Sequence, residues 1–445
     1  MKATNGFTRR EFIAGTSALL LAGELGGQET KTPQVSADAD KLAMEGGEKA
    51  VKKGAAKAVR WGEPERGQLG EMLKQDSLLY WKAPQTTLLI QRFKEHCPLE
   101  HVMTCSSGTA ALHIAVAAAG IAPGDEVITS SFTDIGTVIG ILFQQAVPVF
   151  ADLEPFTYHV STRTVAPLIT ARTKAIIAVH LGGNPSELKE LRALADKHNL
   201  VLIEDCAQAW GALYQGKPIG TIGHLACFSL QTSKHITCGD GGIVASSDER
   251  FGPLLQRFGD KGFDRGIPKF LTERLGTNYR MSEPQAAFAA AQMNRLEDIA
   301  AKRGHLGDLL TSELAGTSGI STPKVAEKSR CTYWHYMLRV RPDKLRCPRA
   351  QFVKAAAAEG VPLSNGYIPL LLHQLPMFQK HAFFAGRWPV KELGLTTMDY
   401  TKVKLPEAEA ILDTCAITPI TEAMDEEYVR SVAKGIRKVA KHYSV

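Results

Sequence analysis

The sequence contains no Cys-x-x-Cys pair, although it has eight cysteines. A zinc ribbon or a thioredoxin-type redox site needs that spacing, so neither is expected. Clusters of His, Cys and Asp at metal-ligand spacing are missing as well, and we expect no metal site. A chain of 445 residues can bury a large core without disulfides. We therefore expect free and mostly buried thiols.

Long apolar runs and a strong excess of one charge are also missing. Beyond the N-terminus, no stretch approaches the ~18 uninterrupted apolar residues of a transmembrane helix, so we expect no membrane span. The 52 basic and 46 acidic residues leave a formal net charge of +6. This charge is modest for the length and does not indicate nucleic-acid binding. The 44% of hydrophobic and 22% of charged residues are typical of a globular protein.

The N-terminus carries an arginine pair and then a short apolar run. Arg9 and Arg10 precede a mostly apolar stretch over 13–22, which is too short to cross a bilayer. This arrangement is typical of a cleavable export signal, and the paired arginines resemble a twin-arginine signal. An ordinary amphipathic helix, and with it a cytoplasmic protein, is the alternative. Residues 27–58, rich in Lys, Glu, Ala and Gly, predict a solvated linker.

Strand-like and helix-like segments alternate in the middle of the chain. Strands are expected at 102–104, 126–129, 147–150, 175–179 and 200–203. Helices are expected between them, one with Ser186 as its N-cap. The alternation predicts an α/β fold with a mostly parallel sheet covered by helices on both faces. After Gly242 the strand pattern ends, 284–316 predicts one or two long helices, and the last third predicts a smaller α+β domain.

Three segments contain residues suited to chemistry at the carboxyl ends of the strands, where sites form in such sheets. A small-residue loop, Ser106 to Thr109, opens a helix and could bind a phosphate, although an ordinary helix cap is as frequent. Asp205 ends a buried strand, where an acid needs a partner. Lys234 lies in a loop before a glycine-rich turn; most such lysines are surface residues. A lysine near a phosphate loop and an aspartate is, however, what pyridoxal phosphate chemistry needs.

At these segments the sequence resembles the DegT/DnrJ/EryC1/StrS sugar aminotransferases, of the fold type I class of pyridoxal-phosphate enzymes. The resemblance runs from near residue 60 to the C-terminus. Its motifs stand in order: SSGTAAL, PGDEVITSSFT, VPVFADLEPFTYHV, AVHLGGNP, EDCAQAWGA, FSLQTSKHITCGDGG, GTNYRMSEPQAA and PEAEAILDTCAITPI. The resemblance implies a large pyridoxal-phosphate-binding domain with a seven-stranded, mostly parallel sheet over 59–325, and a small domain over 326–445. Residues 1–58 are assigned to the signal and linker.

The resemblance also implies roles for seven residues. Lys234 would form the Schiff base with pyridoxal 5'-phosphate and move the proton at the α-carbon. Asp205 would pair with the pyridinium nitrogen, and Gln208 would lie near the ring. The phosphate would be held by Gly108, Thr109 and Ser229. Asn278 would reach the phosphate of a neighbouring subunit, which implies a homodimer with shared active sites.

The implied reaction moves an amino group from glutamate or glutamine to a keto-sugar, expected to be nucleotide-linked, or to a keto-cyclitol. Family members with histidine in place of Lys234 are dehydratases, so the lysine favours transamination.

Asp134 stands where the family usually places an aromatic ring that stacks on the cofactor, and it could instead contact a substrate amine or hydroxyl. His235 is interpreted as a loop residue, with proton transfer left open. The alternatives are another pyridoxal-phosphate reaction, such as elimination or aldol cleavage, and a non-catalytic binding protein.

Overall fold

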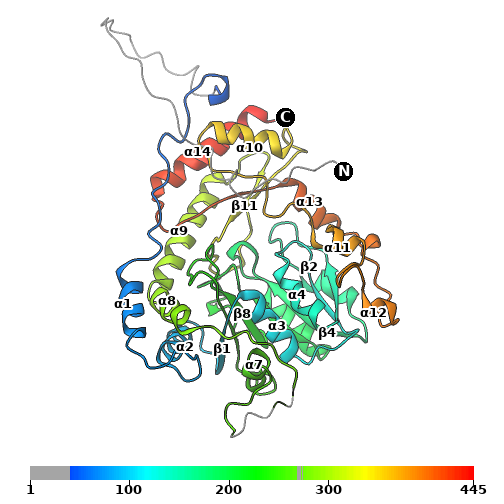
Figure 1. Ribbon diagram of the computed structural model, residues 1–445. Coiled ribbons are helices and arrows are strands. Elements are labelled where there is room, and N and C mark those ends of the chain that lie inside the picture. Colours follow the sequence, from blue (N-terminus) through cyan, green and yellow to red (C-terminus); the bar gives the residue numbers. More distant parts are fainter. Residues whose placement is uncertain (1–40, 268–271, 273) are drawn as a thin grey trace, which may run out of the picture.

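The computed structural model describes residues 41–267, 272 and 274–445. The expected export signal, including Arg9 and Arg10, lies outside these residues and stays a prediction. The described chain forms a larger body around a sheet and a smaller body with helices α10 (Arg349–Ala358) and α14 (Glu426–Tyr443), which lies at the top of Figure 1.

The larger body is built on a seven-stranded sheet with the strand order β1-β9-β8-β5-β4-β2-β3. Its strands are β1 (His101–Cys105), β2 (Glu126–Ser130), β3 (Val147–Ala151), β4 (Thr173–Val179), β5 (Val201–Asp205), β8 (Leu225–Ser229) and β9 (Gly242–Ser246). Strands β3, β2, β4, β5 and β8 run parallel, whereas β9 is antiparallel to β8 and β1. The predicted α/β fold is confirmed. The expectation that strands end after Gly242 was wrong, because that residue begins β9.

Helices cover both faces of this sheet. Every residue of β2, β3, β8 and β9 is buried, which requires cover on both sides. Helix α3 packs against β8, β9, α4 and α7, while α6 packs against β4 and β5. The helices of this body are α1 (Glu63–Met72), α2 (Pro84–His96), α3 (Gly108–Ala118), α4 (Gly136–Phe143), α5 (Thr162–Val165), α6 (Leu188–Lys197), α7 (Gly252–Gly259) and α8 (Glu283–Met293).

One helix start differs from the prediction. Helix α6 begins at Leu188, and its N-cap position is Glu187, not Ser186. The Ser186 hydroxyl instead donates to the carbonyl of Val179 at 3.0 Å, and its amide N–H donates to His180 Nδ1 at 3.0 Å. Ser186 therefore secures the chain at the end of β4.

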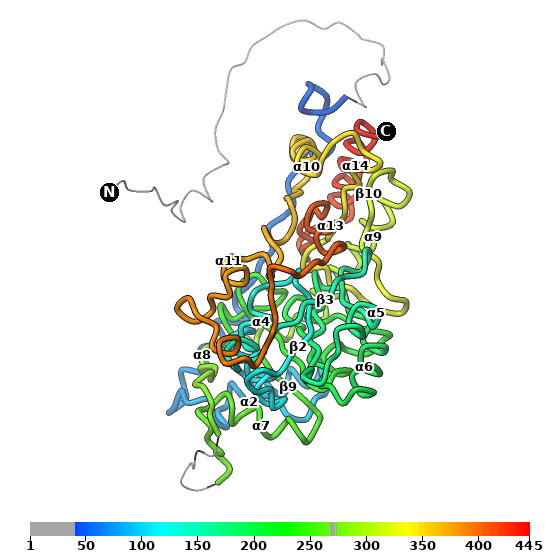
Figure 2. Tube along the Cα trace, turned by 90° about the vertical axis from the view of Figure 1, so that its right-hand side faces the viewer, coloured from blue at the N-terminus to red at the C-terminus, as the bar shows by residue number. Residues whose placement is uncertain are grey.

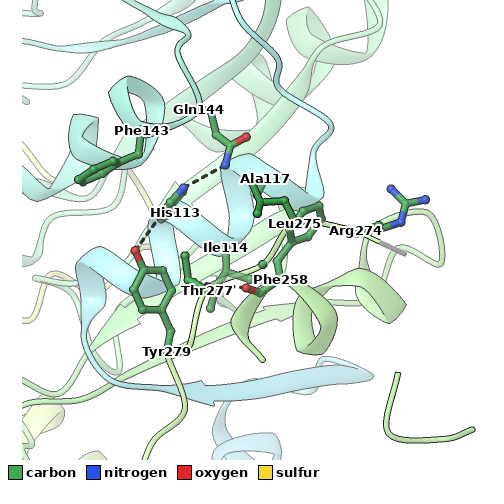
Figure 3. Close-up of a pocket in the computed structure, with 11 residues that line it drawn as sticks. His113, Ile114, Ala117, Phe143, Gln144, Phe258, Arg274, Leu275, Thr277 and Tyr279 are labelled. Atoms are coloured by element: carbon green, nitrogen blue, oxygen red, sulfur yellow. Dashed lines mark hydrogen bonds between the residues drawn. The ribbon is translucent and has the colours of Figure 1, made fainter. Parts of the chain in front are cut away.

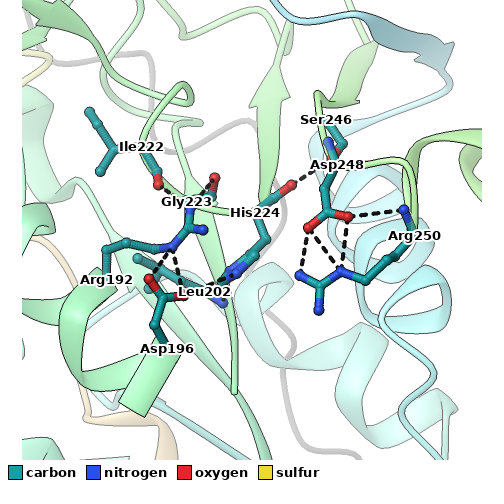
Figure 4. Close-up of polar contacts among 9 residues, drawn as sticks. All are labelled: Arg192, Asp196, Leu202, Ile222, Gly223, His224, Ser246, Asp248 and Arg250. Carbon is teal, nitrogen blue, oxygen red and sulfur yellow. Dashed lines mark hydrogen bonds and ion pairs between the residues drawn. The ribbon is translucent and has the colours of Figure 1, made fainter. Parts of the chain in front are cut away.

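Polar contacts hold the sheet together at the end where the parallel strands begin, away from their carboxyl ends (Figure 4). The Leu202 amide of β5 donates to His224 Nδ1 at 2.9 Å, and the Ser246 hydroxyl of β9 donates to the His224 carbonyl at 2.6 Å. Arg192 of α6 binds Asp196 and the carbonyl of Ile222. The opposite edge is left for the loops that carry chemistry. A separate two-stranded ribbon is formed by β6 (Leu213–Tyr214) and β7 (Lys217–Pro218).

The smaller body has its own apolar core around a three-stranded antiparallel sheet of β10 (Ile320–Ser321), β11 (Tyr336–Val340) and β12 (Cys415–Thr418). Helices α10 and α14 and the C-terminal half of α9 (Leu296–Leu314) complete it. The long helices expected over 284–316 are α8 and α9. The structure also confirms that the last third of the chain contributes to a smaller body of mixed helices and strands.

The segment from α11 to α13 was expected to belong to the small domain that begins at residue 326, but it packs against the larger body. It contains α11 (Pro376–Gln379), α12 (Pro389–Glu392) and α13 (Pro406–Thr414). Its aromatic residues join the core of the larger body, where the Tyr400 hydroxyl donates to the Pro148 carbonyl of β3 at 2.9 Å. In Figure 2 this orange segment runs down beside β2 and β3. The chain after residue 326 therefore contributes to both cores, while the boundary itself stays a prediction.

The composition predicted a solvated linker over 27–58, but its described part, residues 41–58, is partly buried. Leu42 and Val51 are buried in the core of the smaller body. The buried carboxylate of Glu359 accepts from the amides of Ala43 at 2.7 Å and Ala50 at 3.0 Å, and it also pairs with Lys438 at 3.0 Å. This strap, residues 41–58, is thus fastened to α10 and α14.

The eight cysteines are free, and seven are buried, as predicted. Among the described residues, no helix is long and apolar enough to cross a membrane.

Candidate active site

Six of the seven predicted site residues line one cavity of about 370 Å³. They are Gly108, Thr109, Asp205, Gln208, Ser229 and Lys234. The cavity lies where β5 and β8 end, because the register pairs Asp205 with Cys227 and places both Cys105 and Ser229 opposite Gly242. Asn278 is not among the residues that line it. Its side-chain oxygen accepts from Arg280 Nε at 2.8 Å.

The loop before α3 forms an anion cradle beside β8. Ser107 is the N-cap of α3, and its hydroxyl accepts from the Ala110 amide at 3.0 Å. A Cβ on Gly108 would lie only 2.7 Å from the Cβ of Ser229, so only glycine lets the helix start approach this strand. Unpaired amides and the positive end of the helix dipole suit a phosphate group at this point.

Asp205 is a buried carboxylate at the end of β5. One oxygen accepts from the Thr137 hydroxyl at 2.9 Å and the other from the Ala207 amide at 3.2 Å. Burial raises the pKa of Asp205, and these hydrogen bonds and the nearby Lys234 oppose the rise. Among the described residues, Asp205 has no cationic hydrogen-bond partner in addition to these, and a buried carboxylate of this kind suits a cationic ring nitrogen. The sequence did not single out Thr137, which orients Asp205 from the first turn of α4.

Lys234 extends into the same cavity from its loop. Its Nζ lies 3.9 Å from the centroid of the Trp334 ring. Desolvation lowers the pKa of Lys234, and the carboxylates of Asp205 and Asp134 oppose that change. A lysine with a lowered pKa is more often neutral and therefore more nucleophilic.

The aromatic groups of the cavity come from the last third of the chain. Gln208 accepts from the Gly182 amide at 2.8 Å and donates to the Tyr367 hydroxyl at 3.0 Å. Tyr367 and Trp334 both line the cavity. Asp134 lines it too, with its side chain accepting from the Gly136 amide at 2.8 Å. The site therefore has aromatic rings, but none stands at position 134.

His235 points away from the cavity. The side chain is fully buried, and its Nε2 lies 3.0 Å from the Thr332 carbonyl, to which it donates. Burial holds the pKa of His235 well below its ordinary value. The neutral ring therefore fastens the lysine loop to the segment before Trp334, in agreement with the interpretation of His235 as a loop residue.

Three buried side chains next to Asp205 in the fold have ligand atoms close enough together to hold a metal ion. They are His180, Glu204 and Cys206. Protein groups already surround it. Glu204 is 3.1 Å from His180 Nε2 and accepts from the Gly220 amide at 2.6 Å. These contacts account for the buried carboxylate without an ion.

A second cavity of about 360 Å³ opens beside the Asn278 segment (Figure 3). His113 of α3 lies at its wall, with Nδ1 2.9 Å from the Tyr279 hydroxyl and Nε2 3.0 Å from Gln144 Nε2. The apolar side chains of Phe143 and Leu275 line it and are exposed by 60% and 91%.

The comparisons with known proteins agree with this geometry. Residues 62–437 match the model of the DegT/DnrJ/EryC1/StrS aminotransferase family. The chain is 34% identical to a GDP-perosamine synthase of Caulobacter vibrioides over 64% of this chain and 76% of the relative. The structure of an aminotransferase from Psychrobacter cryohalolentis matches with a TM-score of 0.78 and 27% identity, covering 88% of this chain and all of that one. S. venezuelae DesV matches with a TM-score of 0.73 and 29% identity, over 85% and 94% of the two chains.

Proposed function

The chain belongs to the DegT/DnrJ/EryC1/StrS aminotransferase family and is a pyridoxal-phosphate-dependent aminotransferase, and we propose that it aminates a nucleotide-linked keto-sugar. Glutamate or glutamine is the proposed amino donor, and a keto-cyclitol is the second acceptor class. The observation that carries the proposal is the single cavity shared by the anion cradle, Asp205 and Lys234. The name of the Caulobacter relative, GDP-perosamine synthase, supports a nucleotide-linked acceptor.

The residues of the cavity fit the cofactor. Gly108, Thr109 and Ser229 would hold its phosphate, and Asp205 would keep the ring nitrogen protonated. When bound, pyridoxal phosphate supplies an aldehyde that receives the amino group and a ring that withdraws electrons. Lys234 Nζ would bind the cofactor covalently and then carry a proton to and from the substrate carbon.

We further propose that two copies of the chain share their active sites. Asn278 does not reach the cavity of its own chain, and its segment adjoins the exposed apolar side chains of the second cavity. Exposed apolar surface of this kind is typical of an interface. Asn278 would then serve the phosphate site of the partner.

The purified protein with pyridoxal phosphate should show the visible band of a lysine-bound cofactor, and glutamate or glutamine should bleach it. The band is lost because the amino group moves to the cofactor and frees Lys234. A keto-sugar nucleotide should then restore the band as it is aminated. The same sample should have a mass of about twice 48.3 kDa by light scattering. Ammonia or an aldehyde released without any acceptor would contradict transamination, and a fully active monomer would contradict shared sites.

We also propose that a twin-arginine route exports the folded protein. A cofactor enzyme has to fold and bind its cofactor before export, and this route carries folded cargo. The free, mostly buried cysteines agree with folding in a reducing compartment.

Changing Arg9 and Arg10 to lysines is expected to keep the protein in the cytoplasm, because the twin-arginine route depends on the pair. Cell fractionation followed by immunoblotting measures the distribution. Changing Lys52 and Lys53 to arginines in the strap serves as the control and should leave export unchanged. Equal export of the Arg9 and Arg10 variant would show that the segment is no twin-arginine signal.

A further inference from the structure

The loop that carries Lys234 is held from outside by side chains of two other segments. Arg60 Nη1 donates to the Thr232 carbonyl at 2.8 Å, and Arg60 Nη2 donates to the Lys234 carbonyl. Trp334 Nε1 donates to the carbonyl between them, that of Ser233, at 2.7 Å. Three consecutive carbonyls of the loop are therefore bound by side chains distant in sequence.

Arg60 is itself fixed by the helices beneath it. Its carbonyl accepts from Gln292 Nε2 at 2.7 Å and from Arg295 Nη2 at 2.5 Å. Gln292 is fully buried and also donates to Glu65 at 2.7 Å. Arg60 thus connects the junction of α8 and α9 with the lysine loop.

The other contacts of the loop are local or follow Lys234: the Lys234 amide donates to the Gln231 carbonyl at 2.9 Å, and His235 Nε2 donates to the Thr332 carbonyl at 3.0 Å. Residues 231–233 are exposed and belong to no helix or strand. Holding such a backbone in one conformation costs conformational entropy, and charge-assisted hydrogen bonds to a planar guanidinium can offset part of that cost. Lys234 must point its Nζ between Trp334 and Asp205, so the conformation of this backbone decides whether the amine is in place.

We propose that Arg60 is a positioning residue, which holds the carbonyls on both sides of Ser233 and thereby directs Lys234 Nζ into the cavity. The inference rests on the proposed function for its importance in the reaction, but the placement of Nζ is a property of the protein alone. Lysine in place of Arg60 keeps the charge and offers three donors on one nitrogen, but it lacks the planar fork that holds the two carbonyls in a fixed geometry.

The first test uses the cofactor-free protein, because the reactivity of Lys234 can be measured without catalysis. Acetylation with acetic anhydride as a function of pH, read by mass spectrometry of the peptide with Lys234, gives the pH of half-reaction. In Arg60→Ala the lysine leaves its desolvated position, so this pH should move up toward that of an ordinary lysine. Arg60→Lys should lie between Arg60→Ala and the wild type. Arg66→Ala is the control, because Arg66 lies nearby on α1, is exposed and pairs only with Glu63 among the described residues.

The second test measures transamination of the loaded protein. Arg60→Ala should lower kcat by about 10- to 100-fold, as expected when a reacting group is misplaced, with a small change in KM for the amino donor. An unchanged acetylation midpoint in Arg60→Ala would overturn the proposal. The proposal would also be overturned if the loss of activity in Arg60→Ala were explained by a lower Tm alone and if Arg60→Lys did not restore activity. If the wild type shows no transamination while the acetylation midpoint still moves up, the proposed function fails and the positioning role stands.

Discussion

Replacing Lys234 with alanine is expected to lower the transamination rate by about 10³-fold or more, since the proposed function gives its amine two tasks, to anchor the cofactor and to carry the proton. Lys234 is the one lysine among the residues that line the cavity with Asp205 and the anion cradle. The visible band of the lysine-bound cofactor should disappear as well. Absorbance spectra and a donor-to-acceptor amino-transfer assay measure the two effects.

Lys217→Ala is the matched control for this substitution. Lys217 is exposed on β7, and its loss should leave both the band and the rate unchanged. The cavity around Lys234→Ala should still bind the cofactor phosphate, since Gly108, Thr109 and Ser229 remain. A variant that lacks Lys234 and keeps the band would mean that another amine holds the cofactor.

Asp205→Asn is expected to lower the rate by about 10²- to 10³-fold, the range seen when one group that stabilises charge in a closed site is removed. Asparagine has the same shape and can still accept from Thr137 or Ala207. It carries no negative charge and therefore cannot hold a ring nitrogen in its protonated form. The amino-transfer assay tests the loss, and a rate equal to the wild type would contradict the assigned role.

The same variant should be more stable than the wild type when both lack the cofactor. Because burial raises the pKa of Asp205, the folded state binds more protons than the unfolded state above the ordinary carboxyl range. Stability from this group is therefore lost as the pH rises through the raised pKa. Asp205→Asn removes that loss, so its Tm should exceed the wild-type Tm at neutral pH. Asp196→Asn, an exposed position on α6, should show no such gain.

The sequence predicted the part of the site that local motifs carry. Gly108, Asp205, Ser229 and Lys234 each lie within a few residues of a strand end, so an alternating strand and helix pattern brings them to one edge of the sheet. Trp334 and Tyr367 reach the cavity because segments from the last third of the chain pack beside it. No local pattern indicates such a contact, and only the family resemblance marked position 134 as lacking its aromatic ring.

The strap and β9 were missed for different reasons. The strap buries only Leu42 and Val51 within a polar sequence, which gives no periodic signal. The capture of its amides by Glu359 depends on a residue more than 300 positions away. β9 is short and follows a glycine-rich turn, and its place between β8 and β1 comes from pairing and not from composition. The role of Asn278 at the site of a partner stays a prediction.

The position of β1 at the edge of the sheet has a consequence for the growing chain. Within the described residues β1 pairs with β9 alone, so its backbone groups have no strand partner until residue 246 has left the ribosome. The inner parallel strands β2, β4 and β5 are complete by Asp205. The pairing of β9 with β1 spans a long stretch of sequence, so it is expected to be slow. Until it forms, the unpaired backbone of β1 can pair with other chains and promote aggregation. The Lys234 loop joins β8 to β9. It can therefore take up its place only after the chain has been synthesised beyond Ser246.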